Sequence, residues 1–170
     1  MPYSYPFRIA QKLGCDYINL GFAGAAFMEK EMAEYIVSRK DWDFASIEMG
    51  INILAGKEVM SMEEVERRID GFTSILANDP RPIFATSMFG FNCAHQERGR
   101  QMRKMIEHYA KERLIFTDGL ELLDNQAYIS ADLVHPTLEG MEQIGQRWGE
   151  IMRRSLGYEV RVVGTTLGAE

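Results

Sequence analysis

Two kinds of hydrophobic pattern follow one another along this chain. Short, largely apolar runs of strand length occur at 17–20, 44–49, 83–88, 114–117 and 158–163. Between them lie longer stretches whose apolar residues recur every three or four positions, as on one face of a helix, at 6–13, 26–39, 61–77, 98–111 and 137–157. This alternation predicts βα units and an α/β fold with a mainly parallel sheet.

Several residues at the ends of the helical segments predict where the helices begin and end. Gly14 follows the first segment and suits a left-handed C-terminal cap. Ser61 with Glu64 three residues later forms a capping box, and Thr137 is the N-cap expected for the last helix. Within the apolar run 44–49, Glu48 is the exception, and we expect it to pair with a buried partner or to face the end of the sheet.

Length and composition indicate one globular domain, over residues 1–170, with no internal repeat or linker. The 46% hydrophobic and 26% charged content is that of a soluble protein, and no apolar run approaches membrane-spanning length. The net charge of −6, without long blocks of one sign, argues against nucleic-acid binding.

Cysteine usage and the first residues bear on compartment and cofactors. Cys15 and Cys93 lie far apart without the spacing of metal ligands, so we expect reduced thiols, no metal site and a cytoplasmic protein. The stretch at residues 1–6 has neither a basic region nor an apolar one, so it does not have the pattern of a secretory signal.

The segment Asp132-Leu-Val-His135-Pro places a carboxylate three residues before an imidazole, just ahead of the last helix. On a tight loop this spacing lets Asp132 hold one ring nitrogen of His135 and leaves the other free to take a proton from a nucleophile. We therefore predict a hydrogen bond between the two side chains. An exposed turn that carries Asp and His by chance is the alternative.

Two upstream sites follow strand-like runs in the same way. Gly24 closes the turn after 17–20, and Asn52 follows 44–49. Because parallel strands end at a common edge, we expect Gly24, Asn52 and His135 to surround one cavity there. Asn52 as a cap of the following loop is an alternative. The Gly21-x-x-Gly24 turn lacks the third glycine and the acidic partner of a dinucleotide site, so a flavodoxin-like nucleotide binder rests on fold pattern alone.

These blocks resemble a known family. Gly24 after Asn-Leu-Gly-Phe-Ala, Gly50-x-Asn52 and Asp132-x-x-His135-Pro are similar to the second, third and fifth blocks of the SGNH, or GDSL-like, esterases and acylhydrolases. The similarity is strongest to a bacterial subgroup, through the phrases YPFRIA…YINLGFAG, EMGIN and DLVHPT, and it covers about Tyr5 to Trp148.

The resemblance implies a three-layer α/β/α sandwich and hydrolysis of a small-molecule ester through an acyl-enzyme. His135 would be the general base, Asp132 would orient it, and Gly24 and Asn52 would form the oxyanion hole. It also implies that neither a metal nor an organic cofactor is needed.

The first block of the family, a strand ending in Gly-Asp-Ser or Gly-Ser-Ser that supplies the nucleophile, is missing from its usual position. We expect either an N-terminally incomplete domain or a circular permutation. In the second case the segment 158–163 would fill the slot of the first strand, and Thr166 in Gly-Thr-Thr-Leu would stand at the nucleophile's place. An extra edge strand or a mobile end is the alternative.

Three expectations follow from the missing block. Activity of this chain should be impaired, and a non-catalytic remnant that binds a ligand or a partner is the alternative function. The strand slot filled from a second molecule would give a homodimer by strand exchange.

Overall fold

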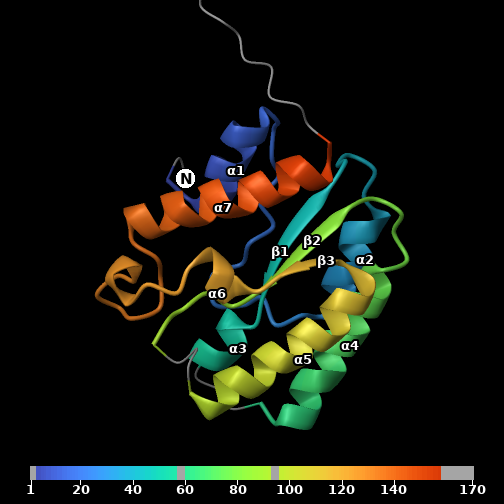
Figure 1. Cartoon of the computed structure of the whole chain (residues 1–170). Helices are drawn as coiled ribbons and strands as arrows, with labels where there is room; N and C mark the ends of the chain where they lie inside the picture. The colour runs from blue at the N-terminus through green and yellow to red at the C-terminus, as the bar shows by residue number, and fades with distance from the viewer. Residues whose placement is uncertain (1–2, 57–59, 93–95, 158–170) are drawn as a thin grey trace, which may run out of the picture.

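The chain folds into three layers, with a small sheet between two groups of helices (Figure 1). The structure is a computed structural model and describes residues 3–56, 60–92 and 96–157. Helices α1 (Tyr5–Leu13) and α7 (Leu138–Ser155) cover one face of the sheet. Helices α2 (Lys30–Ser38), α4 (Met62–Leu76) and α5 (Glu97–Arg113) cover the other. The predicted α/β/α sandwich is therefore confirmed.

The sheet is parallel and has the strand order β1-β2-β3. Its strands are β1 (Ala45–Met49), β2 (Ile83–Ser87) and β3 (Ile115–Thr117). Ile47 pairs with Ala85, which pairs in turn with Phe116. Three of the predicted strands are thus present, each within a residue or so of its expected bounds. Because the strands are parallel, the segments that follow them all leave from the C-terminal edge of the sheet, which is formed by the C-terminal ends of the strands.

Short helices follow the strands at this edge. They are α3 (Ile51–Ala55) after β1, α6 (Gly119–Leu122) after β3, and a 3-10 turn η1 (Gln126–Tyr128) ahead of the Asp-His segment. Sequence patterns do not predict them, because their three to five residues are too few to show a helical period.

The predicted caps are present. Gly14 has φ +66°, and its N–H donates to the carbonyls of Ala10 and Gln11. The Ser61 hydroxyl accepts the N–H of Glu64, and the hydroxyl of Thr137 accepts the N–H of Gly140 in the same way. These caps satisfy N–H and C=O groups that the helices themselves leave without partners.

One helix begins later than predicted. The pattern indicates a start near residue 26, but α2 begins at Lys30. Buried Met28 has φ +57°, which is outside the helical region, and the Glu29 carboxylate accepts the N–H of Phe27. The local turn therefore takes up the first residues of the expected helix.

Two apolar clusters lie on opposite faces of the sheet, because successive strand residues point to opposite sides. Ile83 and Ala85 belong to the larger cluster, with α2, α4 and α5, whereas Phe84 belongs to the smaller one, with α1 and α7. The smaller cluster is centred on fully buried Trp148, Ile144 and Met152 of α7.

The strand expected at Tyr17–Leu20 is not formed, which corrects the prediction. This segment has no regular structure, and Tyr17 and Ile18 are exposed. A strand needs a neighbour for its N–H and C=O groups. Within the described ranges, β1 pairs on one side with β2 and with no strand on the other. Segment 17–20 does not pair with this open side of β1. The strand predicted at 158–163 lies outside the described residues.

Candidate functional site

The Asp-His segment forms a closed loop between η1 and α7. Ile129 and Pro136 face each other in an antiparallel bridge, and the N–H of Ser130 donates to the carbonyl of His135 at 2.8 Å. Leu133 at the tip has φ +62°, a left-handed conformation that tightens the turn. The loop therefore brings position 132 back toward position 135.

Asp132 is held by four hydrogen bonds within this loop. Its Oδ1 accepts from the N–H of His135 and the N–H of Val134, both at 2.9 Å, and from the hydroxyl of Ser130 at 2.7 Å. Its Oδ2 lies 2.6 Å from Nδ1 of His135. These bonds, led by the His135 N–H, hold the pKa of Asp132 well below its ordinary value, so the group is a carboxylate at neutral pH.

The His135 ring is oriented for proton transfer at its outer nitrogen. A carboxylate can only accept, so Nδ1 carries the hydrogen that points to Asp132, and Nε2 of the neutral ring is an acceptor. The ring is 73% exposed, so Nε2 is open to a small molecule. The predicted contact between Asp132 and His135 is thus present.

Gly24 and Asn52 lie near each other on adjoining segments. Asn52, in the first turn of α3, donates from Nδ2 to the carbonyl of Ala26 at 3.4 Å, and Gly24 lies two residues before Ala26. Gly24 has φ +70° and is exposed, with no atom within 4 Å of the position of a Cβ. Its turn can therefore approach a ligand closely.

The stretch that follows β2 contacts both the turn before α3, which carries Asn52, and the Asp-His loop, which carries His135. A Cβ at Gly50, just before α3, would lie 2.8 Å from Cε of Met88. On the other side, the N–H of Asn92 donates to the carbonyl of Leu133 at 3.1 Å. The turns after β1 and β2 and the Asp-His loop are thus joined at the C-terminal edge of the sheet. The arrangement of Gly24, Asn52 and His135 around one cavity stays a prediction. Thr166 lies outside the described residues.

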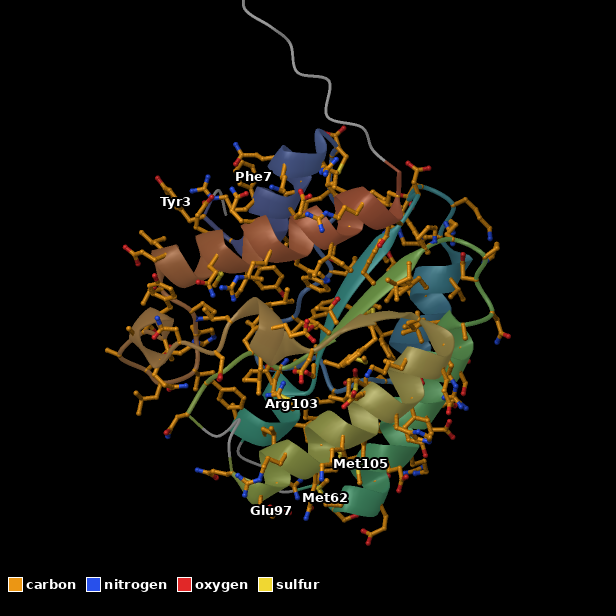
Figure 2. All side chains as sticks on the ribbon, viewed as in Figure 1. Tyr3, Phe7, Met62, Glu97, Arg103 and Met105 are labelled. Carbon is orange, nitrogen blue, oxygen red and sulfur yellow. The ribbon has the colours of Figure 1, made fainter. Side chains whose placement is uncertain are left out.

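Sequence reasoning missed a buried ionic cluster beside this edge, which we call the Arg103 cluster. Nη1 of Arg103 donates to Asp118 Oδ1 at 2.6 Å, to Ser87 Oγ at 2.7 Å and to the carbonyl of Met88 at 2.8 Å. Ser87 Oγ also accepts the N–H of Gly119. Arg103 comes from α5, as Figure 2 shows, so one side chain joins this helix to the ends of β2 and β3. The basic stretch 98–113 gives no signal that one of its arginines is buried.

Glu48 is the second charged residue whose surroundings could be predicted only in part from the sequence. Its Oε1 is shielded from solvent and, within the described part of the chain, has no hydrogen-bond partner, so the buried partner expected for it is absent there. Burial raises the pKa of Glu48 to about 8, and the backbone N–H of Ile51 acts in the opposite direction.

An open hollow of about 450 Å³ lies beside the end of η1 and the first turns of α7. Tyr128 before the loop and Leu138 after it contribute to its wall. The other lining residues are Arg8, Glu139, Glu142 and Gln143. Across the described ranges, no group of three or more His, Cys, Asp or Glu side chains is placed to hold a metal ion. No helix in the same ranges is both long and apolar enough to cross a membrane.

No protein-family model and no curated protein matches this chain. Solved structures do match it. A structure described as a GDSL-like lipase from Bacteroides ovatus has 20% identity and a TM-score of 0.73 over 92% of this chain and 48% of its own, so the chain spans about half its length.

Two further matches cover most of both chains. A carbohydrate acetylesterase from Sinorhizobium meliloti has 11% identity and a TM-score of 0.67, over 91% of this chain and 86% of its own. An aryl esterase from M. smegmatis has 12% identity and a TM-score of 0.66, over 90% and 86%. The chain therefore has the fold of the SGNH-type hydrolases.

Proposed function

We propose that this chain is an ester hydrolase that works through an acyl-enzyme, with His135 as general base and Asp132 as its orienting partner. The observation that carries the proposal is the 2.6 Å contact between Asp132 Oδ2 and His135 Nδ1, on a loop that leaves the rest of the ring exposed. The same fold in two esterases and a GDSL-like lipase supports ester hydrolysis as the reaction class.

In this mechanism a hydroxyl nucleophile attacks the ester carbonyl while Nε2 of His135 takes its proton. The carbonyl oxygen becomes an oxyanion, for which the N–H of Gly24 and the side-chain amide of Asn52 are the proposed donors. His135 then returns the proton to the leaving alcohol as the acyl-enzyme forms. In the second half of the reaction, water attacks the acyl-enzyme while His135 takes its proton, which releases the acid and regenerates the hydroxyl. Asp132 stabilises the imidazolium in each half.

The nucleophile of this set is proposed from the sequence alone. Among the described residues, none of the hydrogen bonds joins a serine or threonine hydroxyl to the His135 ring. We propose Thr166 for the role, on the resemblance of Gly164-Thr-Thr-Leu167 to the family's Gly-Asp-Ser-Leu. Thr166→Ser should then raise ester hydrolysis, because the primary hydroxyl is less hindered. An unchanged rate would remove Thr166 from the mechanism.

The hollow beside η1 and α7 is proposed to take part of a small-molecule ester. Tyr128 and Leu138 offer an aromatic ring and an apolar side chain, and the charged residues of the wall are Arg8, Glu139 and Glu142. Arg8 Nε lies 3.0 Å from Glu142 Oε2 and offsets one of the two carboxylates. The net negative charge that remains disfavours anionic esters, so we propose an uncharged substrate.

A ligand-binding or partner-binding remnant without catalysis is the second candidate. The observation that favours it is the same lack of a described hydroxyl against His135. The two candidates make different predictions for a simple assay, because only a catalytic site depends on the basicity of the His135 ring.

The test is hydrolysis of p-nitrophenyl acetate by the full chain. We expect a rate below the median enzyme turnover of about 10 per second, lowered by His135→Ala roughly 100-fold or to the uncatalysed level. Asp132→Asn and Asn52→Ala should each lower it less. His108→Ala is the control, since His108 is an exposed histidine on α5. Hydrolysis that His135→Ala leaves unchanged would refute the enzyme and leave the binding remnant.

A further inference from the structure

The Asp-His loop fixes its own shape but not its place in the molecule. The bond from the Ser130 N–H to the His135 carbonyl and the bond between Asp132 and the His135 ring both join residues of the loop to one another. The side chains of Asp132 and His135 are 51% and 73% exposed, so little packing holds them against the rest of the chain. The position of the His135 ring therefore depends on contacts between the loop and other segments.

Residues 88–92, directly after β2, provide such contacts, and we call them the bridging segment. Phe91 packs in the larger apolar cluster and Phe89 in the smaller one, on opposite faces of the sheet. The carbonyl of Met88 accepts Nη1 of Arg103 at 2.8 Å. Buried side chains on both faces thus hold the bridging segment to the core, so it can serve as a fixed support for an exposed loop.

The bridging segment contacts both parts of the proposed site. At one end, Met88 packs against Gly50, in the turn that carries Asn52: a Cβ at Gly50 would lie 2.8 Å from Met88 Cε. At the other end, the N–H of Asn92 donates to the carbonyl of Leu133, at the tip of the Asp-His loop, at 3.1 Å. The distance between the oxyanion donor and the general base is therefore set across this one segment.

Gly90, in the middle of the bridging segment, meets the chain that leads into the Asp-His loop. Its N–H donates to the carbonyl of Leu123 at 2.7 Å, and its own carbonyl accepts Nε2 of Gln126, also at 2.7 Å. A Cβ at this position would lie 2.7 Å from Cα of Asp124, well below the roughly 3.5 Å at which carbon atoms pack. Two hydrogen bonds and a close approach of two backbones thus meet at one glycine.

We propose that Gly90 and Gln126 are positioning residues, which dock the Asp-His loop on the bridging segment and so fix the distance between the His135 ring and Asn52. The catalytic value of this docking rests on the proposed function, in which both groups act on one ester. The loop moves as a unit, because the hydrogen bonds that shape it are separate from those that dock it. Neither Gly90 nor Gln126 is assigned a contact with the substrate.

Two variants disturb the docking in different ways. Gln126→Met keeps an unbranched side chain of similar length at an exposed position and removes the donor to the Gly90 carbonyl. Gly90→Ala adds a methyl group that displaces the backbone at Asp124 by about 1 Å, since carbon atoms pack at roughly 3.5 to 4.0 Å.

Each variant has a matched control elsewhere in the chain. Gln101→Met removes a side-chain amide that bonds only to Glu97 of the same helix, on the exposed side of α5. Gly71→Ala, within α4, adds a Cβ whose nearest neighbour is Lys30 Cγ at 3.5 Å, which is an ordinary contact.

The experiment is amide hydrogen exchange of the full chain, followed by ¹H–¹⁵N NMR. The Asn92 amide reports on the docking, because its acceptor is Leu133 across the contact, whereas the Ser130 amide reports on the loop itself, because its acceptor is His135. We expect Gln126→Met and Gly90→Ala to speed exchange at Asn92 roughly tenfold, as the loss of about one hydrogen bond implies, and to leave Ser130 unchanged. The two controls should change neither rate.

Two results would overturn the proposal. One is an unchanged Asn92 exchange rate in Gln126→Met, which decides the matter even if Gly90→Ala fails to fold. The other is exchange at Ser130 that rises as much as exchange at Asn92, since the loop would then unfold rather than shift as a unit.

Turnover tests the link to catalysis separately. Where hydrolysis of p-nitrophenyl acetate depends on His135, Gln126→Met should lower kcat roughly tenfold with little change in KM. Gly90→Ala should lower it up to roughly 100-fold, because a displacement of about 1 Å misplaces the base. An unchanged kcat in Gln126→Met beside faster exchange at Asn92 would refute the catalytic role. A wild type without His135-dependent hydrolysis would instead count against the proposed function, and the exchange result would stand.

Discussion

Removal of the buried guanidinium of Arg103 is the sharpest test of what holds the C-terminal edge of the sheet together. Arg103→Met keeps the apolar stem and removes the charge. In the wild type this charge lies 2.6 Å from the Asp118 carboxylate and also contacts Ser87 Oγ and the carbonyl of Met88. The side chains of Arg103 and Asp118 are 9% and 28% exposed, so water replaces little of what is lost.

The expected loss of stability in Arg103→Met depends on Asp118, whose carboxylate then lacks its cation. A buried ion pair contributes little net stability, but removal of one partner leaves an uncompensated charge that costs roughly 3 to 5 kcal/mol. Asp118 is partly exposed and keeps the N–H of Leu120 as a donor. We therefore expect about 3 kcal/mol for Arg103→Met, the lower end of that range, against a total stability of about 5 to 15 kcal/mol for a domain.

A double-mutant cycle separates the ion pair from other effects. Asp118→Asn should cost a similar amount, because it leaves the arginine buried, while the double variant should cost about 2 kcal/mol less than the sum of the two. Urea unfolding at pH 7 gives each value. Lys111→Met is the control on the same helix: its partner is Glu107 and both side chains are more than 40% exposed, so we expect no measurable loss of stability.

Acid pH gives an independent check on the same pair. Burial raises the pKa of Asp118, but the N–H of Leu120, the charge of Arg103 and the Ser87 hydroxyl together bring it below its ordinary value. A carboxyl group with a lowered pKa contributes stability above its unfolded value near 4 and loses it as the pH falls. The difference between wild type and Arg103→Met should therefore shrink in acid. Costs below 1 kcal/mol with additive single variants would refute the reasoning.

Three further predictions address other parts of the structure. Gly50→Ala should cost roughly 2 to 4 kcal/mol in urea unfolding, because its φ is positive and a Cβ there would crowd Met88. Gly14→Ala, where φ is +66° and the space is free, should cost about 1 to 2 kcal/mol. Equal costs would argue against crowding at Gly50. A ¹³C titration of the Asp132 carboxyl group should have its midpoint below pH 3.8. Stability that this carboxylate contributes is present above pH 3.8 and is lost as the pH falls below it. A midpoint at or above 3.8 would contradict the loop's hydrogen bonds. If residues 158–170 fill the strand slot beside β1, from their own molecule or by exchange in a dimer, their deletion should lower Tm and cause aggregation; unchanged solubility and Tm would make the segment a bystander.

The sequence by itself determined the features of this protein that depend on neighbouring residues. The hydrophobic periods predicted three strands and the main helices, because each period reflects the geometry of one element. The caps at Gly14, Ser61 and Thr137 were predictable for the same reason, since a cap bonds to N–H or C=O groups within a few residues. The bond between Asp132 and His135 also belongs here, because a spacing of three on a tight loop brings the two side chains together.

The tertiary structure decided the features that depend on distant partners. Segment 17–20 has the composition of a strand but forms none, because a strand requires pairing with a neighbour and this segment pairs with none in the described part of the chain. In the sequence Arg103 is one of several cations on a basic helix. Its role follows from the fold, which places Ser87 and Asp118, at the ends of β2 and β3, against it. Glu48 acquires its raised pKa only when helices cover its face of the sheet. Burial and long-range pairing arise from the packing of segments far apart in sequence, so no local pattern records them.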